Sequence, residues 1–286
     1  MSEYIEFSWK TPPVNISGVI LPKYKDHKEQ LRVTTAQLRN LIHQCDDDEL
    51  KHELRSLDDA KLQKFLYARK FDVDDSFQLT KNYISYKKRH PELFDEMDLR
   101  APDIRKSLEN SLPGVLRQKD RKGRCVFVFT GSNWDCSYTI DSIYRAFLFV
   151  LEHLTDHVHN QSNGFVVIVD WTEFTFRQST YLKPGVLKLM IEGLQYCIPA
   201  RFKGIHFVNQ PWYVEAALAC IKPFLHEKVK ERIFVHGNNL STLHEHVHKD
   251  VLPAELGGEE PSYDPRSFLE TLRENVDGKK DEKRTG

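Results

Sequence analysis

The chain has 286 residues, a formal net charge of −1 and 29% charged residues. This length allows one large domain or two small ones, each with a buried core. The near-neutral charge argues against bulk nucleic-acid binding, so any anion site must be a local patch. The first ten residues contain no apolar signal region, no apolar run is long enough to span a bilayer, and the five cysteines form no CxxC pair. We therefore expect a cytoplasmic protein with reduced thiols.

The amino-terminal part predicts a small helical domain. Residues 1–28 contain three prolines and little periodicity, which predicts an irregular arm. Between residues 34 and 91, apolar side chains recur at helical spacing, and the cap-like acids Asp58, Asp59 and Asp74 precede two of the helices.

The pattern changes near residue 125. Four short runs are rich in β-branched and aromatic residues, at 125–131, 164–171, 204–211 and 232–237. Helical stretches separate them, at 140–157, 184–195 and 212–225. Apolar strands that alternate with helices predict βαβ units and a mainly parallel sheet. The charged segment 277–286 predicts a disordered end.

The stretch LHEHVH at residues 243–248 contains His-Glu-x-x-His, the spacing of zinc proteases. A zinc protease also needs a long helix and a third ligand, whereas Pro253 limits this helix and no histidine follows His248. Phosphate-loop, dinucleotide-binding and nucleophile-elbow motifs are missing as well. We therefore expect no metal, no cofactor and no enzymatic activity, and we interpret His244 and His248 as exposed helix residues.

The helical stretch 212–225 is apolar on more than one face, and its only charges are Glu215 and Lys222. A surface helix is normally polar on its outer side. This helix is therefore either packed deep in the core, or it covers an apolar space and can face a membrane. Basic residues lie on both sides of it in the sequence: Arg201, Lys203, Lys228 and Arg232. They suit a phosphorylated anion, although a solvated face paired with glutamates would give the same pattern.

Four long segments resemble the CRAL-TRIO lipid-binding family, in the order in which that family has them. LQKFLYARKFDVDDSF (62–77) resembles its amino-terminal helical signature. Its carboxy-terminal half is similar to PARFKGIHFVNQPWY (199–213), IKPFLHEKVKERIFVHGNNLSTLH (221–244) and LPAELGGEEPSYD (252–264). The likeness spans roughly residues 30–265 and is greatest to the clavesin and tocopherol-transfer branches of the family.

The resemblance implies an α/β fold in three parts. These are an arm with a helical domain (1–100), an α/β domain with a mainly parallel sheet and a gated apolar pocket (101–265), and a tail (266–286). The implied pocket residues are Phe129, Tyr144, Phe147, Leu151, Phe165, Val169, Phe174, Leu182, Leu194, Ile198 and Ile205. The implied gate-helix residues are Val214, Leu218 and Ile221, and the implied phosphoinositide contacts are Arg201, Lys203, Lys228 and Arg232. Tyr67 stands where the family often has arginine, a departure that puts the head-group preference in question.

The function implied by the resemblance is that of a soluble, monomeric carrier. It would hold a retinoid, a tocopherol-like molecule or a phospholipid in a closed pocket and transfer it between membranes. The alternative is a phosphoinositide-binding adaptor in membrane trafficking, of the clavesin type. Both functions imply transient association with anionic phosphoinositide membranes, endosomal or other internal ones, and neither involves nucleic acid.

Overall fold

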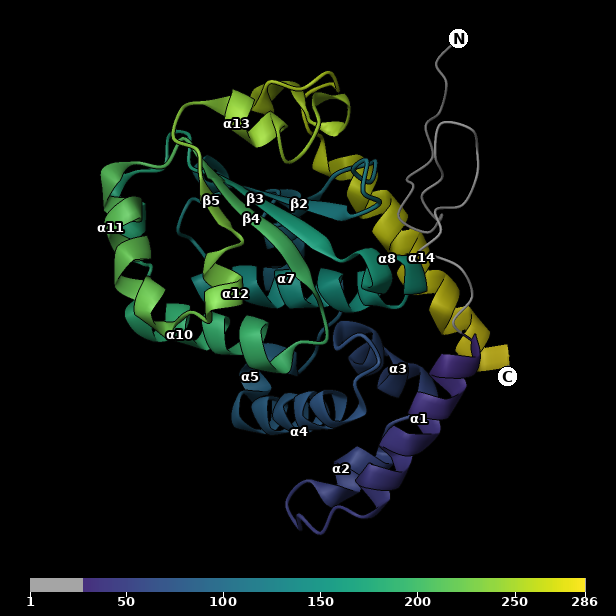
Figure 1. The fold of residues 1–286 in the computed structure, drawn as a ribbon. Coiled ribbons are helices and arrows are strands. Elements are labelled where there is room, and N and C mark those ends of the chain that lie inside the picture. Colours follow the sequence, from purple (N-terminus) through teal and green to yellow (C-terminus); the bar gives the residue numbers. More distant parts are fainter. Residues whose placement is uncertain (1–27, 286) are drawn as a thin grey trace.

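The computed structural model describes the backbone of residues 28–285 and the side chains of residues 28–276 (Figure 1). The expected amino-terminal arm lies outside the described residues. None of the described helices is both long and apolar enough to cross a membrane. All five cysteines are free thiols.

The first part of the described chain is helical, as predicted. Its helices are α1 (Lys28–His43), α2 (Lys51–Ser56), α3 (Asp59–Ala68), α4 (Val73–Arg89) and α5 (Pro91–Phe94). Apolar side chains at helical spacing, among them Leu38 and Leu62, form one buried core. Asp58 caps α3 as expected, but the cap of α4 is Asp72 and not Asp74.

A five-stranded sheet follows, and its strands lie side by side in chain order. They are β1 (Gly114–Val115), β2 (Cys125–Thr130), β3 (Phe165–Asp170), β4 (Phe202–Val208) and β5 (Ile233–Val235). Strands β2 to β5 are parallel, as predicted, and the short β1 pairs antiparallel with β2. Because connections between neighbouring parallel strands are right-handed, strands in chain order place all the connecting helices on one face of the sheet.

The helices of the second part follow from this topology. They are α6 (Pro102–Glu109), α7 (Ile140–Thr155), α8 (Val158–Asn163), α9 (Phe176–Ser179), α10 (Pro184–Glu192), α11 (Trp212–Ile221), α12 (Glu227–Lys230), α13 (Leu240–His244) and α14 (Pro265–Thr285). Figure 1 shows α7 and α10 on one side of the sheet and α13 on the other.

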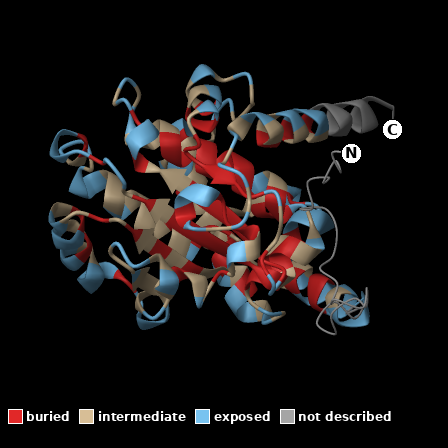
Figure 2. Cartoon of the chain, turned by 90° about the horizontal axis from the view of Figure 1, so that it is seen from above, coloured by how far each residue is buried: buried red, intermediate tan, exposed pale blue. Residues whose placement is uncertain are grey.

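The two faces of the sheet have different coverings. Residues of one parity, such as Val166 and Val208, pack against Leu243, Val247 and Leu252 in a sealed core beside α13. The opposite parity faces α7 and α10. Buried residues run through the centre of the molecule in Figure 2.

The carboxy-terminal segment differs from the expected disordered tail. Helix α14 runs from Pro265 to Thr285, and Phe268, Leu272 and Val276 are buried against the core that contains α6 and β1. Their spacing of four residues gives the helix one apolar face. The charged residues that follow hid this signal, because they dominate the composition of the last ten residues.

Candidate functional site

An apolar cavity of about 280 Å³ lies between the sheet and helices α7, α10 and α11. No charged side chain is among the described residues that line it, and its wall is almost entirely apolar. Strand residues of one parity, such as Val169 and Ile205, form its floor. Val169 and Ile205 are only partly buried, because the cavity leaves their side chains without packing partners on one side. Ile168 and Val208, on the sealed face, are fully buried.

Most of the residues that the family resemblance implies for the pocket and the gate line this cavity. They are Phe129, Tyr144, Phe147, Val169, Phe174, Leu182, Leu194, Ile205, Val214, Leu218 and Ile221. Residues from three strands, from helices α7 and α11 and from the turn after α10 therefore converge on one space, although no single local pattern connects them.

Three of the implied pocket residues lie elsewhere. Phe165 is fully buried at the start of β3, with its ring centroid 5.8 Å from that of Phe127 and 6.2 Å from that of Phe202. It has the correct parity, but the cavity begins only further along the strand, at Val167. Leu151 and Ile198 border a different cavity, beside α3 and α4.

Several cavity residues were missed by the sequence reasoning. Val167 and Phe207 are two residues away from the predicted Val169 and Ile205, so the strand period alone could have identified them. Met190 lies one helical turn before the predicted Leu194, so the helical period could have identified it. Trp171 follows the end of β3, and no periodic signal pointed to it.

A buried pair of tyrosines, Tyr144 and Tyr86, lies behind the cavity wall, which Tyr144 lines. The hydroxyl oxygens of Tyr144 and Tyr86 are 3.4 Å apart, and the Tyr86 hydroxyl donates to the Leu189 carbonyl oxygen at 3.0 Å. Burial raises the pKa of Tyr144, so its hydroxyl stays protonated and can donate a hydrogen bond. At Gly193, the first residue of a π-helical turn, an added Cβ would lie 2.2 Å from the Tyr144 oxygen, so only glycine fits.

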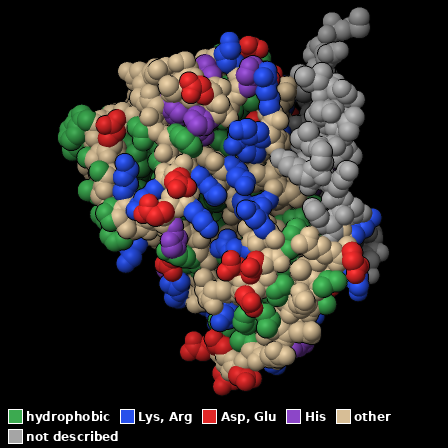
Figure 3. Space-filling view, viewed as in Figure 1, with side chains coloured by type: hydrophobic (Ala, Val, Ile, Leu, Met, Phe, Trp, Pro, Cys, Tyr) green, Lys and Arg blue, Asp and Glu red, His purple; other side chains and the backbone are tan. Residues whose placement is uncertain are grey.

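Helix α11 covers the cavity and also presents apolar side chains outward. Val214 and Leu218 are buried toward the cavity, whereas the Trp212 side chain is 72% exposed. Nearby, Phe176 and Phe224 are each 61% exposed. Hydrophobic side chains gather over α11 at the left of Figure 3. Large exposed apolar side chains gathered on one side of a protein are typical of a membrane or protein contact.

Few polar contacts hold α11 in place at its start. Gln210 donates from Nε2 to Glu215 Oε1 at 2.9 Å, and the backbone N–H of Gly237 donates to Gln210 Oε1 at 3.2 Å. The Tyr213 hydroxyl donates to the Phe174 carbonyl oxygen. The loop after β5 therefore holds the residues that precede α11.

The four basic residues implied for phosphoinositide contact lie around the starts of β4 and β5. Arg201 donates to the Gln161 carbonyl oxygen at 3.0 Å, and Arg232 donates to the Phe202 carbonyl oxygen at 2.8 Å. Burial, together with the nearby Arg232, lowers the pKa of Arg201. Lysine and arginine side chains cluster on this face in Figure 3.

Glu227, considered as a partner of this cluster, pairs with another lysine, Lys230, at 2.7 Å. Within residues 28–276, no ion pair involves Arg201, Lys228 or Arg232. Helix α12 ends at Lys230, so Lys228 and Arg232 do not share one regular helix face.

The His-Glu-x-x-His motif has structural contacts. His244 Nε2 lies 2.9 Å from the Leu256 carbonyl oxygen, and His248 accepts from the backbone N–H of Asp250. Both histidines are half-buried and not exposed as expected. Among the residues that the structure describes, no group of three His, Cys, Asp or Glu side chains is placed to hold a metal ion.

The comparisons with known proteins agree with this architecture. The CRAL/TRIO domain model matches residues 109–258. Human clavesin-2 is 46% identical over 216 residues, which are 75% of this chain and 66% of that protein. Clavesin-1 of Xenopus laevis is 44% identical over 216 residues, 75% of this chain and 65% of that protein. The chain thus spans just under two thirds of the length of these curated relatives.

A solved structure shows the same fold at low sequence identity. The crystal structure of Sfh5 has a TM-score of 0.54 and 14% identity, covering 87% of this chain and 98% of that one. The structure combines a helical region, a mainly parallel sheet and an apolar cavity under α11. The sequence matches the CRAL/TRIO domain and is similar to the clavesins. The chain belongs to the CRAL/TRIO lipid-binding family.

Proposed function

We propose that this protein is a lipid carrier that shields one hydrophobic molecule in the cavity under α11 and transfers it between membranes. The observation that carries this proposal is the uncharged cavity beneath a helix that is apolar on both its inner and outer sides. Burying apolar ligand surface stabilises the complex by about 0.8 kcal/mol per methylene group. A closed cavity therefore keeps such a molecule out of water during transfer.

The wall of the cavity favours a neutral ligand. A charged head group buried there would lose its hydration without gaining an ionic partner, which is strongly unfavourable. A retinoid or a tocopherol-like molecule, which is almost entirely apolar, fits this wall better than a phospholipid whose head group is enclosed.

The outer surface supports a membrane-coupled release step. Trp212 and Phe224 would enter the interface of the bilayer, while Arg201, Lys203, Lys228 and Arg232 would contact phosphoinositide head groups. A membrane that binds the open form better than the closed form shifts the population toward opening. The ligand would then leave into an apolar environment.

A second candidate is a monomeric phosphoinositide-binding adaptor in membrane trafficking. It is favoured by the basic residues Arg201, Lys228 and Arg232, which have no ion pairs within the described residues, and by the similarity to clavesins. Such an adaptor would need the basic cluster, but its membrane recruitment would not need a filled cavity.

Two variants separate the candidates. Ile205→Trp fills the cavity, and the Lys228→Glu/Arg232→Glu pair removes the basic cluster. Native mass spectrometry of the purified protein should detect one bound neutral lipid, lost in Ile205→Trp, and transfer between liposomes should fail in both variants. Protein from its source tissue that carries no lipid, while recruitment depends only on the basic cluster, would favour the adaptor.

A further inference from the structure

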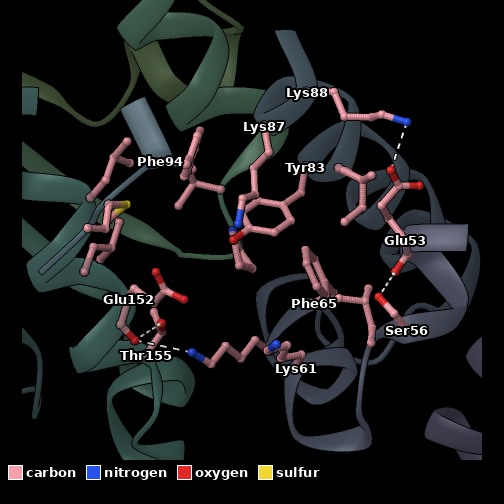
Figure 4. Close-up of a pocket in the computed structure, with 18 residues that line it drawn as sticks. Glu53, Ser56, Lys61, Phe65, Tyr83, Lys87, Lys88, Phe94, Glu152 and Thr155 are labelled. Atoms are coloured by element: carbon pink, nitrogen blue, oxygen red, sulfur yellow. Dashed lines mark hydrogen bonds and ion pairs between the residues drawn. The ribbon is translucent and has the colours of Figure 1, made fainter. Parts of the chain in front are cut away.

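A second cavity, of about 400 Å³, lies where α2, α3 and α4 meet α7 (Figure 4). We call it the α4–α7 cavity. Helix α7 separates it from the first cavity, because Tyr144 and Phe147 face the first and Leu148 and Leu151 face the second. Residues spaced three to four apart along one helix therefore line two distinct spaces.

The floor of the α4–α7 cavity is apolar. Phe65, Leu148 and Leu151 are each less than 5% exposed, and Ile84 and Ile198 are 6% exposed. In Figure 4, the Tyr83 ring lies between Phe65 and Phe94. A floor of this kind, in a cavity of several hundred Å³, can bury a hydrocarbon chain.

The rim differs from that of the first cavity because it carries four lysines. Two of them are neutralised within the protein: Lys64 pairs with Asp156 at 2.5 Å, and Lys88 pairs with Glu53 at 3.0 Å. The other two, Lys61 and Lys87, have no ion pair within residues 28–276.

Lys87 is held at the cavity by aromatic rings. Its Nζ lies 5.5 Å from the centroid of Tyr83 and 5.2 Å from that of Phe94. These cation–π contacts orient the ammonium group and leave its hydrogen-bond donors for a further acceptor. Figure 4 shows Lys87 reaching into the middle of the space, beside the Tyr83 ring.

One carboxylate opposes these lysines. Glu152 on α7 lines the cavity without an ion pair among the described residues, and it contributes, after burial, to the raised pKa of Tyr83. Two unpaired ammonium groups and one carboxylate leave a single positive charge at the rim. A ligand with one negative charge balances it, whereas a phosphate monoester carries between one and a half and two charges at neutral pH.

We propose that the α4–α7 cavity binds the anion of a long-chain fatty acid. The carboxylate lies between Lys61 and Lys87, where charge-assisted hydrogen bonds form, and the chain lies on the floor formed by Phe65, Leu148 and Leu151. The two cavities then select by charge, since the first has an uncharged wall and the second has a basic rim.

The test uses the full delipidated chain with oleate as the probe and with Ile205→Trp in the background to block the first cavity. Oleate should bind this protein at one site, and a diazirine analogue of the fatty acid should label the peptide that contains Phe94 and Met97, which line this cavity and not the first one. Lys87→Gln should weaken oleate binding at least tenfold, because one charge-assisted contact is lost. Glu152→Gln should strengthen it several-fold. Methyl oleate, which has no charge, should bind at least tenfold more weakly than oleate.

Lys81→Gln is the matched control. Lys81 lies on the same helix and over the ring of Phe77, 5.0 Å from its centroid, but it does not line the cavity. Its replacement should leave oleate binding unchanged. Equal effects of Lys81→Gln and Lys87→Gln, or labelling confined to first-cavity peptides, would overturn the proposal. If Lys87→Gln unfolds, the exposed Lys61→Gln provides the same comparison. Lipid transfer through the first cavity is a separate readout, so the proposed carrier function can stand or fall independently.

Discussion

Mild acid should destabilise the fold through a chain of hydrogen bonds on the sealed face of the sheet. The Thr242 hydroxyl donates to the Asn239 carbonyl oxygen at 2.8 Å, so its oxygen accepts from His236 Nδ1 at 2.7 Å. His236 Nε2 then accepts from His206 Nδ1 at 3.0 Å. This order, assigned from the network, requires a neutral His236, because protonation would place two N–H groups against each other.

The size of the effect follows from His206. Burial, and then the nearby His236, His246 and Arg124, lower the pKa of His206 to about 3 from an ordinary value of 6.5. Between these values the unfolded chain binds a proton that the folded chain does not, so the free energy of unfolding falls as the pH falls. The slope approaches ~1.4 kcal/mol per pH unit, or about 2 kcal/mol between pH 7.5 and pH 5. The pKa of His236 is also lowered, by burial and by His246, and Glu245 partly opposes this shift.

Urea unfolding at several pH values from 7.5 to 5, followed by circular dichroism, measures this slope. His206→Gln cannot titrate, so the variant should lose about 2 kcal/mol less than the parent over this range. Carboxylates contribute equally to both proteins and cancel in the difference. His52→Gln, on the exposed side of α2, should behave like the parent. The reasoning is refuted if the parent and His206→Gln lose stability in parallel.

Three further changes probe the first cavity and its surroundings. Ile205→Trp should abolish ligand uptake in a fluorescence titration, whereas Phe165→Trp should leave uptake intact and cost about 1–3 kcal/mol in urea unfolding through overpacking; the opposite pattern would contradict the cavity map. Lys228→Glu/Arg232→Glu should weaken binding to phosphoinositide liposomes at least tenfold, less so at high salt, and Lys70→Glu/Arg273→Glu is the charge-matched control. Gln210→Ala removes the two hydrogen bonds that connect the start of α11 to the loop after β5 and leaves the Tyr213 contact with Phe174, so ligand release in a stopped-flow experiment should accelerate several-fold; an unchanged rate would mean that the Gln210 contacts do not hold α11.

The alternation of strands and helices was predictable because each strand is a continuous apolar run. The runs near 125, 165, 204 and 232 became β2 to β5, paired in parallel as expected. Strand β1 was not predictable, because it has two residues and exists only through its pairing with β2. The buried face of α14 depends on Phe268 and Leu272, whose spacing was readable but lay in a segment dominated by charge.

The site was less predictable because its limits depend on packing. Strand parity assigns Phe165, Val167 and Val169 to the same face, but it does not tell where along β3 the covering helices leave a space. Leu151 was expected in the same pocket as Phe147 because both lie on the inner side of α7. The helical region packs against that helix further along and encloses a separate cavity there, which no local pattern indicates.

The two faces of the sheet are packed differently, and one loop connects them. On the sealed face, Val208 and the histidine chain pack against α13, whereas the opposite face borders the cavity under α11. The loop after β5 begins at His236, which belongs to that chain, and continues to Gly237, whose N–H donates to Gln210. Gln210 in turn holds Glu215 on α11. Helix α11 is thus tied to the sealed face by this chain of hydrogen bonds, and to the cavity wall by the Tyr213 contact with Phe174 and by the packing of Val214 and Leu218.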